Sequence, residues 1–199
     1  KQNQAINQFD TPAVTEVLEN IQFHVAFVHT ISETAWFADL LLPEDGELES
    51  LQLLKIGPTA GIENYREKTG FVIKQPVVKR AGNTMNPTDI ATEIVYRLGK
   101  LDAYNQDINE GGYLGIKLKG TAWELKHDQK YSAAELYDRF CRAATHNMSD
   151  GEVEFGLDWF KQNGAFLRPY QNKVGKGIVV GRGYERPWYL YPVMKEMGI

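Results

Sequence analysis

The sequence has few of the residues on which several kinds of functional site depend. It contains one cysteine, Cys141, and so cannot by itself supply a disulfide framework, an iron–sulfur cluster or a cysteine-rich zinc site. Cys141 lies in an apolar pattern of helical spacing, which predicts a buried structural thiol. The histidines show no His-x-x-x-His spacing, and no serine lies in a Gly-x-Ser-x-Gly turn. The sequence therefore gives little support to a hydrolase or a mononuclear zinc enzyme.

An excess of positive charge and a long apolar run are also absent. The formal net charge is -4 at pH 7, whereas domains that bind nucleic acids usually carry a basic surface. No apolar stretch is long enough to span a bilayer, and no signal peptide is recognisable. We therefore expect a soluble protein with no nucleic-acid partner and no direct membrane insertion.

The chain does contain enough apolar side chain for a folded core. Its 199 residues are 43% hydrophobic, which suits one well-packed α/β domain. A helix capped by Thr11, with Pro12 at its first position, leads into an apolar strand at residues 22–28. A second strand, at residues 40–42, ends at Pro43. This alternation predicts an α/β fold with a doubly wound, mainly parallel sheet flanked by helices, followed by a helical and irregular C-terminal third.

The turn between these two strands is rich in small and hydroxyl residues. Ser32 is the expected N-cap of a short helix, and Glu33 places negative charge in its first turn. Because α/β proteins usually hold nucleotides and phosphates at the carboxyl ends of parallel strands, this turn is the candidate binding segment.

The same segment resembles the signature of a known enzyme family. Residues 32–43 are Ser-Glu-Thr-Ala-Trp-Phe-Ala-Asp-Leu-Leu-Leu-Pro, and Leu-Glu follows five residues after the proline. This pattern is similar to that of molybdopterin oxidoreductases of the dimethyl-sulfoxide-reductase superfamily, which hold molybdenum or tungsten between two pterin guanine dinucleotides. Residues 87–99, which end in Arg-Leu-Gly, are similar to a helix of that family, and Asn3 matches the asparagine of its Gly-x-Asn-Pro turn. The likeness covers about the first half of the chain.

The resemblance implies that this chain is a fragment of the α/β part of such a catalytic subunit. Residues 1–104 would form part of a pterin-dinucleotide-binding domain, and residues 105–199 a helical and loop-rich extension of the same domain. Asn3, Ser32 and Thr34 are the expected cofactor-binding residues, through an amide, hydroxyls and backbone N–H groups. The expected cofactor is molybdopterin guanine dinucleotide with molybdenum or tungsten, held in the parent enzyme and not by this chain alone.

The resemblance also implies partners and a location. The remainder of the catalytic subunit and an iron–sulfur electron-transfer subunit are the expected partners, in a prokaryotic cytoplasm or periplasm. The metal-ligand residue and the cysteine motif of the family lie outside the matched part. We therefore identify no catalytic residue and no metal ligand, and we expect the isolated chain to be inactive.

Some positions depart from the family pattern. Val28 stands where the family often has an aspartate that hydrogen-bonds guanine, and Lys1 and Gln4 replace the glycine and the proline around Asn3. Valine cannot accept a hydrogen bond, so either a neighbour such as His29 supplies a contact or guanine is held differently. These departures favour a second hypothesis, in which the chain is a stand-alone α/β binding or interaction module that has lost the cofactor.

A third hypothesis is a small independent enzyme that uses an acidic cluster for acid–base or metal chemistry. The cluster consists of Glu44, Asp45, Glu47 and Glu49. Because these residues follow a proline that ends a strand, we interpret them as a solvated turn in which Glu49 holds the loop by hydrogen bonds.

Further along the chain, helix signals are clearer than strand signals. Helices are predicted at residues 86–99, from the capping box at residues 132–135 through Cys141, and at about 152–163 with Gly164 as the stop. Residues 44–69 are expected to be an acidic turn followed by loop.

Four other stretches have weaker patterns. Residues 70–78 are expected to be an edge or bulged strand, because they contain a proline. Residues 100–112 are polar and turn-rich and mark the best internal boundary. Residues 175–183 indicate a hairpin or loop, and the aromatic residues at 187–192 a surface on which a further part of a longer protein packs.

Overall fold

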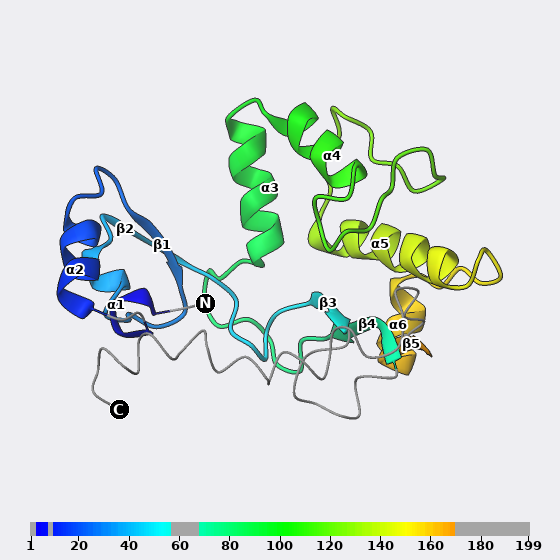
Figure 1. Cartoon of the computed structure of the whole chain (residues 1–199), viewed down its shortest axis with the longest axis horizontal. Helices are drawn as coiled ribbons and strands as arrows, with labels where there is room; N and C mark the ends of the chain where they lie inside the picture. Colours follow the sequence, from blue (N-terminus) through cyan, green and yellow to red (C-terminus); the bar gives the residue numbers. More distant parts are fainter. Residues whose placement is uncertain (1–2, 8–9, 57–67, 170–199) are drawn as a thin grey trace, which may run out of the picture.

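The computed structural model describes residues 3–7, 10–56 and 68–169, which form two groups of elements. Figure 1 shows the first group at the N-terminal end, with two helices, two strands and a single 3₁₀ turn. Its elements are α1 (Gln4–Asn7), α2 (Thr11–Glu19), β1 (Val25–Val28), η1 (Ala35–Phe37) and β2 (Leu40–Pro43). The second group contains β3 (Gln52–Ile56), β4 (Lys68–Lys74), α3 (Pro87–Arg97), α4 (Leu101–Asn109), α5 (Ala133–Met148), α6 (Leu157–Asn163) and β5 (Ala165–Pro169). The segments 175–183 and 187–192 lie outside the described residues.

The two strands of the first group form a parallel pair, as the sequence predicted. Val25 lies opposite Leu40, and Val28 lies opposite Pro43. The cap of the preceding helix was predicted wrongly, because α2 starts at Thr11 and its N-cap is Asp10. The carboxylate of Asp10 accepts a hydrogen bond from the backbone N–H of Ala13 at 3.2 Å, and Thr11 is the first residue inside the helix.

The strands of the second group form an antiparallel sheet in the order β3-β4-β5. Two strand predictions were wrong here. Residues 44–69 are not all turn and loop, because they contain β3. The strand β4 pairs with β3 on one side and with β5 on the other, so it lies in the centre of its sheet and not at an edge. It ends at Lys74, and the proline that suggested an edge position comes after it. The chain is therefore a mixed α/β protein with a parallel pair and an antiparallel triple, and the described residues do not confirm a doubly wound parallel sheet.

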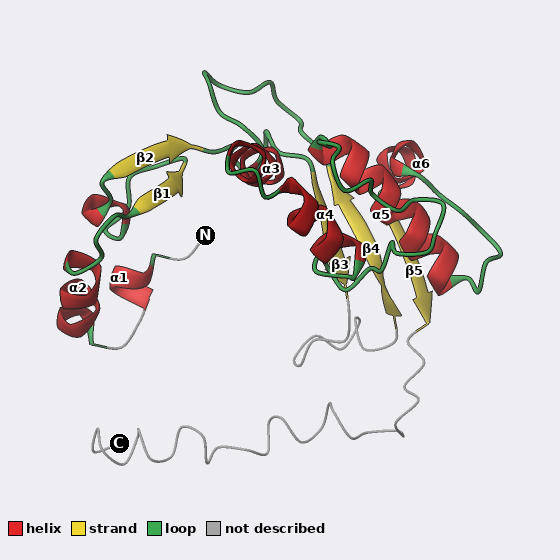
Figure 2. Cartoon of the chain, turned by 90° about the horizontal axis from the view of Figure 1, so that it is seen from above, coloured by secondary structure: helices red, strands yellow, loops and turns green. Residues whose placement is uncertain are grey.

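The hydrophobic core lies between the antiparallel sheet and α5, which crosses its face in Figure 2. Leu53 and Phe71 from the sheet pack in one cluster with Phe140 and Cys141 from α5. The buried thiol was predicted correctly, since Cys141 has no exposed surface and burial raises its pKa to about 12.

The capping box at the start of α5 is also confirmed. The backbone N–H of Ser132 donates to the Glu135 carboxylate at 2.8 Å, and the hydroxyl of Ser132 accepts from the backbone N–H of Glu135 at 3.4 Å. The helix α3 begins after its N-cap Asn86, as predicted, and Gly99 follows its end with φ at 65°.

Residues 100–112 were predicted to be turn-rich but mostly form α4. Its buried residues Leu101, Asn105, Ile108 and Asn109 have helical spacing, but two of the four are asparagines, so the apolar pattern is weak. Asn105 donates to three backbone carbonyls of residues 126–129, and Asn109 donates to the carbonyl of Leu125 at 2.9 Å. These bonds attach the irregular segment after α4 to the helix.

The helix α6 begins at Leu157 and not near Glu152, because residues 152–156 are held in a non-helical form by α5. The hydroxyl of Thr145 accepts from the backbone N–H of Phe155 at 2.9 Å. The predicted stop at Gly164 is confirmed by its φ of 80°. None of the helices in the described part of the chain is long and apolar enough to cross a membrane.

Candidate functional site

The structure brings the predicted site residues Asn3, Ser32 and Thr34 together, although about thirty residues separate the first from the others. The side-chain oxygen of Asn3 accepts from the backbone N–H of Thr34 at 3.1 Å and from its hydroxyl at 2.8 Å. The same hydroxyl accepts from the backbone N–H of Ala5 at 2.9 Å. Asn3 and Thr34 therefore fasten α1 to the turn between β1 and β2.

The other half of the Asn3 amide contacts the next residue of the signature. Its nitrogen donates to the carboxylate of Glu33. The pKa of Glu33 lies below its usual range because its own backbone N–H and the Asn3 amide donate hydrogen bonds to it. Both ends of the Asn3 amide are thus engaged by the turn, which keeps its shape through internal contacts.

Ser32 is not the N-cap that the sequence predicted. The helical segment is the single 3₁₀ turn η1, whose N-cap is Thr34. The Ser32 hydroxyl accepts a long hydrogen bond of 3.4 Å from the backbone N–H of Ala35, and its carbonyl accepts from Trp36 at 3.0 Å. Thr34 instead binds Asn3 through its hydroxyl and its backbone N–H.

A cavity of about 170 Å³ opens where β1 and β2 reach their carboxyl ends. Val28, the last residue of β1, and Glu44, the first residue after β2, both line it, together with Asn3, His29 and Ser32. The backbone N–H of Glu44 donates to the carbonyl of Val28 at 3.2 Å, which holds the two strand ends side by side. This is the edge of a parallel sheet at which α/β proteins bind nucleotides.

The cavity contains one nearly buried carboxylate. The exposed fraction of Glu44 is 6%, and its Oε1 lies 3.5 Å from Nδ1 of His29. The residues that line the cavity in the described part of the chain include neither lysine nor arginine. Hydroxyls, an imidazole and a carboxylate are groups that can bind a base or a sugar.

The acidic turn after β2 is less exposed than the sequence suggested. Glu49 does hold the loop, since its carboxylate accepts from the backbone N–H groups of Gly46 at 2.9 Å and Ala81 at 2.7 Å. The interpretation as a solvated turn was wrong for Glu44 and for Asp45, which has no exposed surface and pairs with Arg80 at 2.8 Å. These partners belong to residues 80–86, which run beside the turn and cover it.

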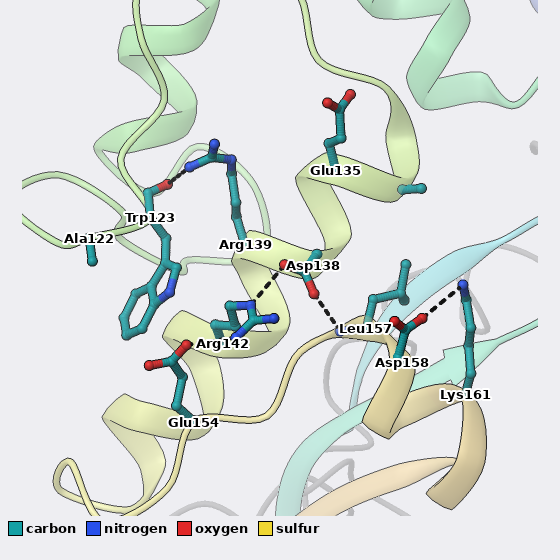
Figure 3. Close-up of a pocket in the computed structure, with 11 residues that line it drawn as sticks. Ala122, Trp123, Glu135, Asp138, Arg139, Arg142, Glu154, Leu157, Asp158 and Lys161 are labelled. Carbon is teal, nitrogen blue, oxygen red and sulfur yellow. Dashed lines mark hydrogen bonds and ion pairs between the residues drawn. The ribbon is translucent and has the colours of Figure 1, made fainter.

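A wider cleft of about 660 Å³ lies between α5 and α6 (Figure 3). The guanidinium of Arg142, which lines this cleft, donates hydrogen bonds of 2.8 Å to the carboxylates of Asp138 and Glu154. These bonds raise the pKa of Arg142. The other oxygen of Asp138 accepts from the backbone N–H of Leu157 at 2.8 Å and so caps α6. These contacts attach α6 and the segment before it to α5, which is a structural role.

The first group of elements carries many exposed apolar side chains. Trp36 is 79% exposed, and α2 has no buried residue. A mostly apolar cavity of about 590 Å³ lies in this first group, between α1, α2 and the turn that joins β1 to β2. Ser32 lines this cavity as well as the polar one. Two parallel strands rarely form a stable unit alone, because such sheets are normally covered on both faces. The first group therefore leaves an unusually large apolar area uncovered by the rest of the described residues.

A scan of the chain against protein-family models finds no match, and no curated protein sequence matches it. In the described part of the chain, no three His, Cys, Asp or Glu side chains are grouped so that they could hold a metal ion. The family resemblance thus rests on the residues of the signature.

The Ser32 hydroxyl and the His29 imidazole of this cavity are groups that would suit the guanine end of the pterin guanine dinucleotide that the resemblance implies. The cavity supplies acceptors and donors for a base, beside the turn to which the resemblance assigns the cofactor contacts. The sequence indicated Asn3, Ser32 and Thr34 but missed Glu44, which it placed in a solvated turn. The position of Glu44, directly after a short apolar strand, is the signal that points to the cavity.

Proposed function

We propose that this chain is part of the catalytic subunit of a molybdenum or tungsten bis-pterin oxidoreductase and contributes to the cradle of one pterin guanine dinucleotide. One observation carries the proposal. Asn3 and the signature turn, which the resemblance assigns to the same cofactor, lie in direct contact beside a polar cavity at the carboxyl ends of two parallel strands.

The residues of the site have separate roles in this proposal. Asn3 and Thr34 are positioning residues, because their side chains are engaged with the turn and with α1. Ser32 lines the cavity and offers its hydroxyl to the cofactor. The bound pterins and metal supply the two-electron redox chemistry, and the protein binds and orients them. The isolated chain is then inactive.

The exposed apolar side chains around β1 and β2 support a further part of the proposal. We propose that the parallel pair belongs to a larger, doubly wound sheet whose other strands and helices come from the remainder of the catalytic subunit. Both β1 and β2 have one edge with no partner strand in the described part of the chain. The iron–sulfur electron-transfer subunit and a prokaryotic cytoplasmic or periplasmic location remain predictions of the resemblance.

A second candidate function is a stand-alone α/β binding or interaction module without the cofactor. Two observations favour it. Val28 lacks the acceptor that the family pattern often has at this position, and the Asn3 amide is engaged entirely within the turn, which therefore holds its shape with no cofactor bound.

The size of the native polypeptide separates these two functions. An antibody raised against this chain should detect, in the source cells, a polypeptide several times larger than 22.6 kDa. A native product of 22.6 kDa would favour the stand-alone module and remove the catalytic subunit from consideration.

A further inference from the structure

The mostly apolar cavity between α1, α2 and the turn that joins β1 to β2 has no cover among the described residues. Its lining includes the exposed side chains of Ile6, Ile31 and Trp36. In Figure 1 and in Figure 2, no described helix or strand of the second group lies beside α1 or α2. Exposed apolar surface that is gathered in one hollow usually marks a site of contact with protein.

The surroundings of this cavity are acidic. Glu33 lines it, and so do Thr11 and Thr15, which lie one turn apart on α2. Glu19 follows Thr15 by a further turn and therefore extends the same face of the helix. Residues 3–43 contain five acidic side chains and neither lysine nor arginine. The surface that covers the cavity should therefore combine apolar side chains with positive charge.

One segment of this chain has that composition. Residues 170–199, which follow β5 and lie outside the described residues, contain five basic and two acidic side chains. They include the aromatic run at residues 187–192, and tryptophan, tyrosine and arginine are the residues most enriched at the centres of protein interfaces. The bases that precede this run are Lys173, Lys176, Arg182 and Arg186.

The length of this segment allows the contact. The aromatic run begins about 18 residues after Pro169, the last residue of β5, and extended chain spans at most about 3.3–3.6 Å per residue. The run can therefore reach about 60 Å from Pro169, which is about twice the diameter of a small domain. Because the segment is tethered to the same chain, its effective concentration is high, and the contact needs little intrinsic affinity.

We propose that residues 170–199 bind across the apolar cavity and cover it. The aromatic run contacts Trp36, and the basic side chains lie beside Glu19 and Glu33. This inference does not rest on the proposed function, because it requires no cofactor. It gives the cavity an occupant from within the chain and leaves the edges of β1 and β2 to the further strands proposed above.

The test is carbodiimide cross-linking of the full native polypeptide, followed by mass spectrometry of its proteolytic peptides. A carbodiimide joins a carboxylate directly to a lysine amine that lies beside it. Since residues 3–43 contain no lysine, any amine joined to their carboxylates comes from elsewhere. We expect cross-links from Glu19 or Glu33 to Lys173 or Lys176.

The ion pair of Lys130 with Glu93, at 2.6 Å, is the internal control, because the reagent should capture it in either case. Capture of this pair without a cross-link from Glu19 or Glu33 to residues 170–199 would overturn the proposal. Cross-links from these two carboxylates only to lysines elsewhere in the polypeptide, or in another protein, would overturn it as well, since a different occupant would then cover the cavity.

A second measurement reads the apolar part of the contact. Replacing the aromatic side chains of Trp188, Tyr189 and Tyr191 by serine should raise the rate at which hydroxyl radicals oxidise Trp36 several-fold, as measured by mass spectrometry. Trp159, which stacks on Phe155 in the second group, is the matched reporter, and its unchanged oxidation shows that the variant has folded.

A milder variant covers the case in which the triple substitution does not fold. Lys173→Glu combined with Lys176→Glu keeps the aromatic run and should change the oxidation of Trp36 in the same direction, because like charges then face each other. An unchanged rate for Trp36 in a folded variant of either kind would show that the segment does not cover the cavity.

Discussion

At the scale of single residues, Asn3 links two segments that would otherwise be independent. Its side chain binds the N–H and hydroxyl of Thr34 and the carboxylate of Glu33, while α1, which follows it, has only four residues. A helix of one turn has no stability of its own, so its place depends on these bonds. The position of α1 beside the signature turn therefore depends on the hydrogen bonds of the Asn3 side chain.

We expect Asn3→Ala to lower the free energy of unfolding by about 1–3 kcal/mol, because it leaves the part-buried N–H and hydroxyl of Thr34 without their acceptor. Urea denaturation followed by fluorescence measures the change. Asn7→Ala, at an exposed position of the same helix, is the control and should have little effect. Equal stability of the two variants would mean that Asn3 does not hold the turn.

Glu49 gives the acidic turn a dependence on pH. Hydrogen bonds from the N–H groups of Gly46 and Ala81 lower the pKa of its carboxyl from the usual 4.5. Because the pKa is lower in the folded state, this contribution to stability is present above pH 4.5 and is lost as the pH falls through the folded value. The chain should thus lose stability below pH 4.5, and Glu49→Gln should lose less.

Unfolding midpoints measured between pH 7 and pH 3 test this expectation, with Glu19→Gln on the exposed surface of α2 as the control. Identical pH profiles for Glu49→Gln and the wild type would show that the hydrogen bonds to the loop do not stabilise the folded state.

At the scale of elements, the sequence predicted best where local signals decide the structure. The helices α3 and α5 were predicted because Asn86 and Ser132 cap them and apolar spacing continues from each cap. The helix α4 was missed because Asn105 and Asn109 face inward, and their partners are carbonyls of a distant segment that no local pattern reveals.

The candidate site was likewise predicted where local signals decide the structure and missed where contacts with distant residues decide it. The signature and Asn3 indicated the turn, but the burial of Glu44 depends on Val28 and Met85, which come from other parts of the chain. The position of Glu44 directly after a short apolar strand indicates the end of the sheet, but the burial of its side chain is decided by these contacts with distant residues. The central position of β4 likewise depends on β5, which follows it by about ninety residues.

The two sheets should differ in stability. The strand β4 lies between two strands and beneath α5, whereas β1 and β2 are paired only with each other among the described elements and are mostly half-exposed or exposed. In hydrogen exchange of the isolated 199-residue chain, we expect the amides of β1 and β2 to exchange faster than those of β4.

The same strands in the full native polypeptide should be protected as strongly as β4, because the remainder of the subunit would cover them. Equal protection of both sheets in the isolated chain would contradict the view that the parallel pair is part of a larger sheet.

At the scale of the whole molecule, the described residues divide into a well-packed group and a poorly covered one. The buried core gathers around α5 and the antiparallel sheet, while the candidate site lies with the parallel pair and its exposed apolar side chains. This division agrees with the proposal that the parallel pair belongs to a larger sheet in a catalytic subunit.

The most direct measurement of the central claim is the content of metal and guanine nucleotide in the full native polypeptide that carries this chain. The purified protein is divided for elemental analysis of molybdenum and tungsten and for acid hydrolysis, which releases GMP from a pterin guanine dinucleotide. We expect molybdenum or tungsten with two GMP for each metal atom, as a bis-pterin site requires. A purified, folded protein with neither metal nor GMP would contradict it.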